Sequence, residues 1–238
     1  MAKLSLDGLV EQLRAAYGND LRTVVLYGSA AAGELIPNRS DYNVLVIVDR
    51  LGAEQLRKAA AVAQAWADAG NPPPLTMTLE EWRRSADIFP MEYADVLERH
   101  RALHGQPPFE GMSVGRRDLR HQLEHEAMGK LLRFRQGIMA AGGDPKRQIA
   151  LLQDSLSAMM ILFRAVERLK GARPTTDYEE LSRKAGEDIG FDAEPFVRVV
   201  RHLRGREKLA TAEAGATVDG YLRGLEELVR WLDRFPAE

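Results

Sequence analysis

The chain has 238 residues, of which 45% are hydrophobic and 29% charged, which is the composition of an ordinary globular protein. That length is large for one domain and comfortable for two small ones. The formal net charge of −2 gives no overall attraction to nucleic acid or anionic lipid, and the absence of cysteine excludes disulfides and thiolate metal sites.

No segment of the sequence has the pattern of a targeting or membrane-spanning element. The N-terminal segment alternates apolar and charged residues at helical spacing and lacks the apolar core of a signal peptide. No uninterrupted apolar run reaches the roughly 18 residues that a membrane-spanning helix needs. We therefore expect a cytoplasmic protein with no membrane partner.

The first half of the sequence predicts helices and strands in alternation. Apolar residues at helical spacing open the chain, and Gly18 ends the helix that they predict. Short β-rich runs predict strands at 23–27 and 44–48, the second apolar enough to be buried on both faces. An alanine-rich segment predicts a helix at 53–69.

The segment after the prolines at 72–74 continues this mixed pattern. A strand is expected at 75–79, and Thr78 with Glu81 forms the capping box of a short helix. We expect a further strand at 89–96 and a helix at 97–103.

Glycines and prolines between 105 and 111 mark the predicted domain boundary. The sequence therefore predicts a first domain at 1–108 and a second at 109–238. An apolar stripe with helical spacing opens the second domain, and its members are Leu119, Leu123, Ala127, Leu131, Phe134 and Ile138.

The rest of the second domain also predicts helices. Asp144 and Pro145 are the residue types of an N-cap and a first helical turn. Shorter helices are expected at 177–186, 193–204 and 217–234. The predicted fold class is α+β, a small mixed β-sheet domain flanked by helices and followed by an all-α helical bundle.

Candidate site residues lie around the first two predicted strands. LeuTyrGlySer at 26–29 follows one strand, and SerAspTyrAsn at 40–43 precedes the next. A glycine and a small hydroxyl residue after a strand turn the chain sharply and let backbone N–H groups approach an anion. A carboxylate at the mouth of the next strand, here Asp41, would hold a divalent cation against the same phosphate. The order of these parts predicts a site for a metal and a triphosphate, with Ser40 and Asn43 beside it.

This arrangement resembles the signature of the polymerase-β-like nucleotidyltransferase superfamily, over roughly residues 5–104, and in particular its small bacterial antibiotic nucleotidyltransferases. The resemblance implies a mixed sheet flanked by helices, two Mg²⁺ ions held by carboxylates, and in-line attack on the α-phosphate of a nucleoside triphosphate with loss of pyrophosphate. It assigns the phosphate-contacting turn to Gly28 and Ser29 and the first metal carboxylate to Asp41. The third carboxylate, which should follow on a later strand, is assigned to Glu92.

Asn43 stands at the position of the second carboxylate and departs from the family pattern. An amide oxygen carries no net charge and cannot act as a base. Loss of a catalytic carboxylate commonly costs roughly 4–8 kcal/mol of barrier. We therefore expect a pseudoenzyme that binds ATP or another nucleoside triphosphate with one Mg²⁺ ion, held by Asp41 and Glu92, and whose nucleotidyl transfer is weakened or lost.

Two other functions remain open from the sequence. The first is an active transferase that moves a nucleoside monophosphate onto a small hydroxylated acceptor or a protein side chain, with Asp41 and Glu92 as catalytic residues. The second is a helical RNA-cleaving or RNA-binding module with an inhibitory first domain, because Arg120 and His125 have the spacing found in the HEPN ribonuclease family. The acceptor is not identified, nucleic acid is not expected as a partner of the whole chain, and the apolar residues of the second half are compatible with a homo-oligomer.

Two histidine pairs and two basic groups are further candidate sites. His100 with His104, and His121 with His125, share a helix face if their segments are helical. The second pair also fits the H-x-x-E-H pattern of inverted zinc proteases, although a solvated helix side is the simpler interpretation. The same holds for two basic groups that could bind phosphate, Arg198–Lys208 and Lys130–Arg135.

Overall fold

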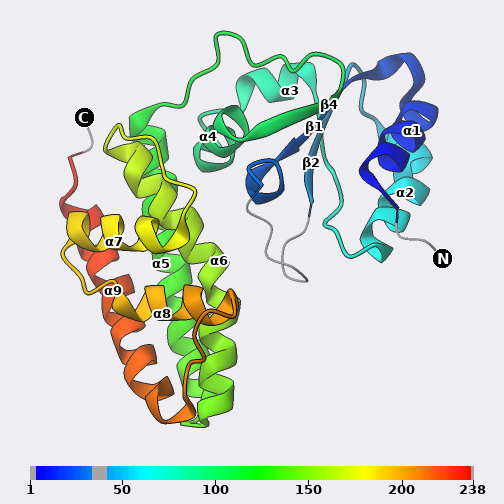
Figure 1. Ribbon diagram of the computed structural model, residues 1–238. Helices are drawn as coiled ribbons and strands as arrows, with labels where there is room; N and C mark the ends of the chain where they lie inside the picture. Colours follow the sequence, from blue (N-terminus) through cyan, green and yellow to red (C-terminus); the bar gives the residue numbers. More distant parts are fainter. Residues whose placement is uncertain (1–3, 34–41, 237–238) are drawn as a thin grey trace. The chain divides into compact units, whose positions relative to one another are not determined.

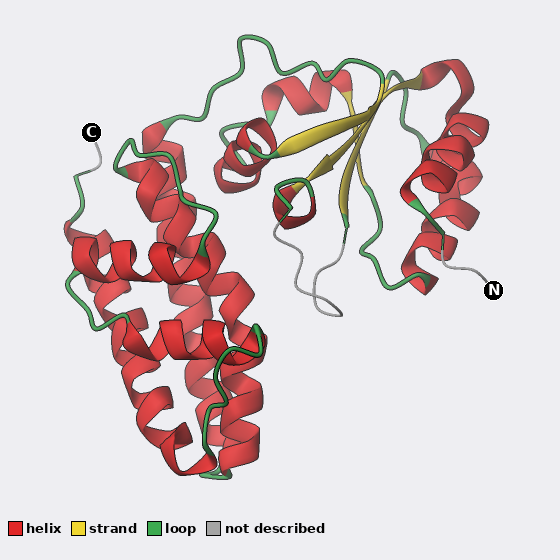
Figure 2. Ribbon diagram, in the orientation of Figure 1, coloured by secondary structure: helices red, strands yellow, loops and turns green. Residues whose placement is uncertain are grey.

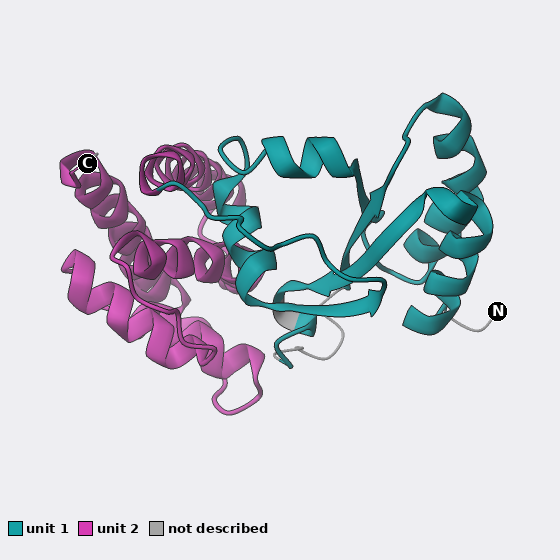
Figure 3. Ribbon diagram, turned by 90° about the horizontal axis from the view of Figure 1, so that it is seen from above, with its two compact units in different colours: residues 1–115 teal, residues 116–238 magenta. Residues whose placement is uncertain are grey.

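The computed structural model describes residues 4–33 and 42–236 of the chain (Figure 1). Within this described part, all strands lie before Gly105, and only helices and loops follow (Figure 2). The chain divides into two compact units, Met1–Gly115 and Arg116–Glu238 (Figure 3). The predicted α+β class, with a small mixed sheet first and a helical bundle second, is confirmed.

The two units divide after Gly115, whereas the sequence placed the boundary after residue 108. Phe109, Met112 and Val114 pack against a core cluster of the first unit. Because these apolar side chains lose their exposure to water in that unit, the segment that carries them belongs to it.

The first unit is built on a four-stranded sheet with the order β3-β2-β1-β4. Strand β1 (Leu21–Tyr27) pairs antiparallel with β2 (Asn43–Val48) and with β4 (His100–His104). Strand β3 (Leu75–Thr78) runs parallel to β2, so the sheet is mixed. The two central strands are apolar along most of their length because helices cover both faces of the sheet.

One face of the sheet packs against α1 (Leu6–Tyr17) and α2 (Ala53–Asp68). Its core includes Leu9, Val24 and Trp66, all fully buried. Alternate residues of β1 and β2 point to this face, as the two-residue period of a strand requires. The 3₁₀ turn η1 (Gly18–Asp20) joins α1 to β1.

The other face packs against α3 (Leu79–Arg84) and α4 (Pro90–Glu98). The ring of Trp82 stacks on that of Tyr93 with centroids 4.1 Å apart, and the Tyr93 hydroxyl donates a 2.7 Å hydrogen bond to the Trp82 carbonyl. Burial raises the pKa of Tyr93 to about 12. This aromatic pair joins α4 to α3 within the core on this face of the sheet, and it thereby fixes the position of the other residues of α4.

The predicted strand at 89–96 and helix at 97–103 are both wrong. Residues Pro90–Glu98 form helix α4, and His100–His104 form strand β4. Pro90 occupies the first helical turn, where its missing N–H costs nothing and its fixed φ is already helical. Met91 with Ala94, and Tyr93 with Val96, bury side chains at a spacing of three, which suits a helix, whereas Met91 and Tyr93 alone imitate the alternation of a strand.

The capping signals predicted from the sequence are confirmed. The backbone N–H of Glu81 donates to Thr78 Oγ1 at 3.1 Å, and that of Thr78 donates to Glu81 Oε2 at 2.7 Å. Asp144 Oδ1 accepts from the backbone N–H groups of Lys146 and Arg147 at 2.8 and 3.2 Å. Each cap satisfies donors that a helix N-terminus leaves without intrahelical partners.

The second unit is a bundle of long and short helices (Figure 1). The helices are α5 (Arg116–Ala141), α6 (Pro145–Leu169), α7 (Tyr178–Ile189), α8 (Glu194–Leu203) and α9 (Ala214–Arg234), with the 3₁₀ turn η3 (Thr211–Glu213) before the last. The rings of Phe196 and Tyr221 stack in its core with centroids 4.1 Å apart. A Cβ at Gly224 would lie 2.6 Å from Phe196 Cε2, so glycine at this position lets α8 and α9 approach closely.

Helix α6 is long and apolar enough, by length and composition alone, to cross a membrane. It is also the central helix of the bundle, and half of its most apolar window is buried inside the structure. Core helices of soluble proteins pass the same test of length and composition. The sequence contained no uninterrupted apolar run because charged residues such as Arg164 and Glu167 lie along this helix, and both are buried here.

Candidate functional site

The end of strand β1 is where the sheet, the glycine turn and helix α4 meet. Tyr27, the last residue of β1, lies opposite Asn43 of β2 and His100 of β4. Gly28 follows with φ +77°, a left-handed conformation that side-chain-bearing residues rarely adopt, and opens the 3₁₀ turn η2 (Gly28–Ala30). The predicted turn after the first strand is therefore present, and it requires glycine.

Two polar side chains face Gly28 at this turn. A Cβ at Gly28 would lie 3.6 Å from Asp95 Oδ2 and 3.7 Å from Asn43 Nδ2. Asp95 comes from the second turn of α4 and Asn43 from the start of β2, so two elements of the sequence converge on the glycine. Gly28 is itself buried, and having no side chain it leaves room between a carboxylate and an amide.

Arg99 links the same turn to α4. Its backbone carbonyl accepts the N–H of Gly28 at 3.1 Å, and its Nη1 lies 3.4 Å from Asp95 Oδ1. The side chains of Arg99 and Asp95 are 10% and 21% exposed. Because the protein dielectric at such partly buried positions is lower than that of water, this charge pair is stronger than a surface pair. One oxygen of Asp95 is thus directed at Arg99 and the other at Gly28.

The structure brings together some of the residues predicted for the site. Gly28 and Asn43 lie together, as predicted. Ser29 lies in η2, and Ser40 and Asp41 fall outside the described residues. Glu92 lies on α4 with an exposed side chain, so its placement on a strand was wrong.

Asp95 is not among the residues predicted for the site, although its carboxylate lies beside Gly28. If Pro90 is taken as the start of a helix, Tyr93 and Val96 fall on its buried side and Asp95 on the neighbouring flank. Pro90 therefore predicts a helix here, whereas the alternation of Met91 and Tyr93 predicts a strand. The carboxylate beside the glycine turn therefore comes from a helix and not from a later strand.

The described residues of this site that could contact a Mg²⁺ ion are one carboxylate and one amide. Mg²⁺ is commonly bound through one or two carboxylates, with the remaining positions taken by substrate phosphates and water. Asp95 supplies a carboxylate and Asn43 an amide oxygen, which together suit an ion that arrives with a triphosphate. Within the described part of the chain, no group of three or more His, Asp or Glu residues gathers in a way that could hold a metal.

The other candidates from the sequence lie in less suggestive surroundings. His100 and His104 are on strand β4 and not on a helix; His100 Nδ1 lies 2.9 Å from the Val96 carbonyl. His121 and His125 are exposed on α5, the latter with 86% of its side chain accessible. Arg120 donates from Nε to Phe235 O and from Nη2 to Leu232 O, both at 3.0 Å. These bonds satisfy carbonyls at the C-terminal end of α9, which gives Arg120 a structural role there.

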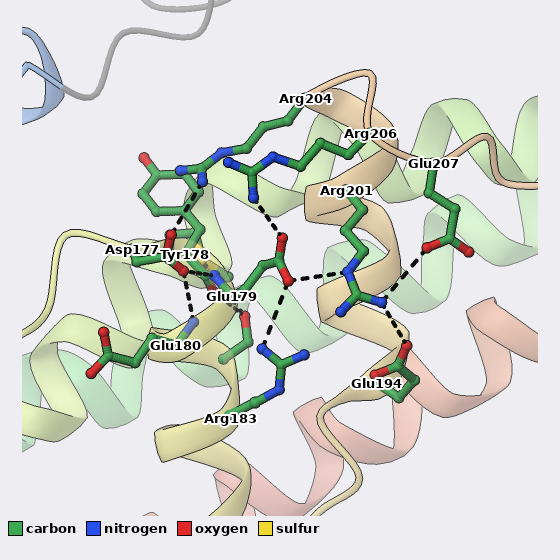
Figure 4. Close-up of polar contacts among 12 residues, drawn as sticks. Asp177, Tyr178, Glu179, Glu180, Arg183, Glu194, Arg201, Arg204, Arg206 and Glu207 are labelled. Atoms are coloured by element: carbon green, nitrogen blue, oxygen red, sulfur yellow. Dashed lines mark hydrogen bonds and ion pairs between the residues drawn. The ribbon is translucent and has the colours of Figure 1, made fainter.

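The basic cluster predicted at 198–208 is an ion-pair network between α7 and α8 (Figure 4). Glu179 lies at its centre, with Oε2 3.0 Å from Arg201 Nε and Oε1 3.1 Å from Arg206 Nη1. Arg204 Nη1 lies 3.4 Å from Asp177 Oδ2, and Arg198 pairs with Glu213. These four arginines therefore have carboxylate partners within the unit and do not form an uncompensated surface for phosphate or RNA.

The carboxylate of Asp177 should give the helical unit an acid-dependent stability. The backbone N–H of Glu180 holds the pKa of Asp177 below its usual value, with help from the Arg204 charge and the N–H of Glu179. A lowered pKa in the folded state contributes stability that is present above the unfolded value, about 3.9, and is lost as the pH falls through the folded value. We expect Asp177→Asn to destabilise the protein by roughly 0.5–1 kcal/mol at pH 7, and the difference to vanish near pH 2. Urea unfolding followed by circular dichroism at both pH values measures this, and an unchanged difference at acid pH would refute the assignment.

Comparisons with known proteins support the fold of the whole chain. No protein-family model matches the chain, and no curated protein matches it. A crystal structure of spectinomycin adenyltransferase AAD(9) from Enterococcus faecalis, with ATP and spectinomycin, is similar with a TM-score of 0.60 at 13% identity. The similarity covers 93% of this chain and 98% of that one. The chain therefore shares the fold of that adenyltransferase over nearly its whole length.

Proposed function

We propose that the chain binds a nucleoside triphosphate with one Mg²⁺ ion at the Gly28 turn, and that its nucleotidyl transfer is weakened or lost. The observation that carries this proposal is the pair of side chains at Gly28, because one is the carboxylate of Asp95 and the other is the amide of Asn43. A nucleotidyltransferase that uses two ions needs anionic oxygens shared between them. An amide at that position supplies an oxygen without charge.

Each residue of the turn has a role in this proposal. The glycine allows backbone N–H groups to approach phosphate oxygens without a side chain in between. Asp95 and the oxygen of Asn43 would hold the ion, which when bound supplies positive charge against the phosphates. Arg99 orients Asp95 and brings a cation close to the same place. Asp41, which lies outside the described residues, keeps its predicted role as a metal carboxylate.

An active transferase is the second candidate function. AAD(9), whose crystal structure holds ATP and spectinomycin, is an adenyltransferase and shares the fold over nearly the whole chain. Asp95 adds a carboxylate that the sequence did not predict, so the site has more negative charge than the presence of Asn43 alone suggests. Pyrophosphate release from ATP with spectinomycin and other hydroxylated antibiotics as acceptors separates this candidate from the first. The HEPN-like function stays a prediction that no feature of the site favours.

Asp95→Asn should abolish Mg²⁺-dependent stabilisation of the protein by ATP, whereas Glu92→Gln should preserve it. A ligand at 100 times its dissociation constant stabilises the folded state by about 2.7 kcal/mol, which raises the melting temperature by several degrees. The asparagine keeps the size of the side chain but removes the charge that holds the ion. A thermal melt with ATP, with and without Mg²⁺, measures both variants.

The two variants form a matched pair because both carboxylates lie on α4, three residues apart. Loss of stabilisation in Glu92→Gln but not in Asp95→Asn would restore Glu92 as the third carboxylate and overturn the site described above. A wild-type protein that does not respond to ATP and Mg²⁺ at all would refute nucleotide binding.

A further inference from the structure

A pocket of about 270 Å³ opens between α5 and α6 in the helical unit. Its floor is apolar and includes Phe134 and Met159, which are 3% and 1% exposed. The polar residues that line it are Lys130, Arg133, Asp154 and Ser155. It thus combines an apolar base with a few polar groups, as small-molecule sites generally do.

The base of the pocket is held in place by contacts inside the bundle. The ring of Phe134 stacks on that of Tyr221 with centroids 4.9 Å apart. Ser155 Oγ lies 3.1 Å from the Tyr221 hydroxyl and 3.0 Å from the Leu152 carbonyl. Because a serine hydroxyl has one proton, Ser155 donates it to the carbonyl and accepts from the tyrosine, which leaves a second lone pair for a ligand. A site built from packed and hydrogen-bonded groups needs little reorganisation to bind.

The charged residues that line the pocket are two cations, Lys130 and Arg133, and one anion, Asp154. Lys130 Nζ lies 3.2 Å from Glu126, and the nearby Arg135 pairs with Glu226 at 2.8 Å. Arg133 is exposed, and in the part of the chain that the structure describes its guanidinium forms no ion pair. It differs in this from the arginines of α8, which all have carboxylate partners. Arg133 is therefore a cation at the pocket available to an anionic ligand.

The volume limits what the pocket can hold. An apolar cavity of roughly 150 Å³ holds one benzene molecule. About 270 Å³ has room for one ring with one or two small substituents, and too little for a nucleoside triphosphate. The pocket is therefore distinct from the nucleotide site proposed at Gly28.

We propose that this pocket binds a small ring compound that carries one anionic group and one hydrogen-bond donor. The ring packs on Phe134 and on the sulfur of Met159, a favourable contact between thioether and aromatic ring. The anionic group meets Arg133 and Lys130 in charge-assisted hydrogen bonds. The donor is accepted by Asp154 or by the second lone pair of Ser155.

The test uses 4-hydroxybenzoate as a probe and the Met159 methyl group as the reporter. The full chain is labelled with ¹³C at its methionine methyl groups, and the Met159 signal is assigned by its loss in Met159→Leu. We expect a saturable shift of that signal, with a dissociation constant of about 1 mM. The neutral 4-hydroxybenzamide, which has the same ring and donor, should bind at least about tenfold more weakly because it lacks the charge.

Two protein variants complete the test. Arg133→Ala should weaken binding of 4-hydroxybenzoate at least about tenfold, and Arg173→Ala, which also removes an exposed arginine but lies outside the pocket, should leave it unchanged. Ala158→Phe, which fills the pocket, should abolish the shift. If Ala158→Phe fails to fold, the comparison of Arg133→Ala with Arg173→Ala still tests the proposal, because both arginines are exposed. The proposal is overturned by a Met159 signal that does not saturate, by equal affinity for the acid and the amide, or by equal effects of the two arginine variants.

Discussion

Asn43→Asp is expected to raise pyrophosphate release from ATP by about 100-fold or more over the wild-type protein. The substitution keeps the size of the side chain and places a second carboxylate beside Asp95 at Gly28. Together with Asp41 in its proposed role, these two carboxylates would supply the anionic oxygens that a second ion requires, and catalytic carboxylates are commonly worth several powers of ten in rate. A coupled assay for pyrophosphate, with Mg²⁺ and a panel of hydroxylated acceptors that includes spectinomycin, measures the change.

The double variant Asn43→Asp with Asp95→Asn is the control for this gain. If the two carboxylates act together, removing Asp95 should cancel the gain in the manner of a double-mutant cycle. A wild-type protein that already turns over ATP and loses this activity in Asn43→Asp would contradict the account of a weakened site. It would instead support the active transferase.

Gly105→Ala is expected to destabilise the first unit by roughly 3 kcal/mol or more. Gly105 follows strand β4 with φ +65°, and a Cβ at this position would lie 2.1 Å from the backbone carbonyl oxygen of Arg22. The strained φ costs on the order of 1–3 kcal/mol, and a clash with backbone adds to this because the neighbouring strand must shift. Strand β4 is also fixed here by the hydroxyl of Thr23, which donates to the His104 carbonyl at 2.7 Å. Urea unfolding followed by the fluorescence of Trp66 and Trp82 measures the loss of stability. The Trp231→Phe substitution is made in all proteins compared, because it removes the tryptophan fluorescence of the second unit.

Gly111→Ala is the matched control in the same unit. Its φ of +74° is similar, but no atom lies within 4 Å of the Cβ that alanine would add. The strain is therefore shared and the clash is not, so Gly111→Ala should cost only about 1–2 kcal/mol. Equal losses in the two variants would show that β4 does not meet β1 as closely as described.

Much of the fold could be predicted because local signals and tertiary packing agree in most elements. The apolar runs of β1 and β2 reflect burial on both faces of the sheet, and the caps at Thr78 and Asp144 form the hydrogen bonds that their side chains predict. The segment 89–103 failed because it is short and its apolar spacing fits either element. There the aromatic packing of Tyr93 on Trp82 decides the outcome, and packing between distant segments is not visible in a local pattern.

The candidate site could be predicted only in part, for the same reason. Gly28 and Asn43 lie next to strands that were correctly placed, so their proximity followed from the order of the motif. Asp95 is more than fifty residues further along the chain and reaches Gly28 only because α4 is a helix. Because Pro90–Glu98 is a helix and not a strand, Asp95 and not Glu92 is the carboxylate beside Gly28. The basic cluster was ambiguous because the sequence does not show that Glu179 of α7 faces the arginines of α8.

A crystal structure of the chain with ATP and Mn²⁺ tests the central claim most directly. Mn²⁺ replaces Mg²⁺ at oxygen sites and its anomalous scattering shows how many ions are bound and where. The account predicts a triphosphate at the Gly28 turn and a single ion in contact with Asp95. Two ions bridged by shared carboxylates, or a nucleotide bound away from Gly28, would contradict it.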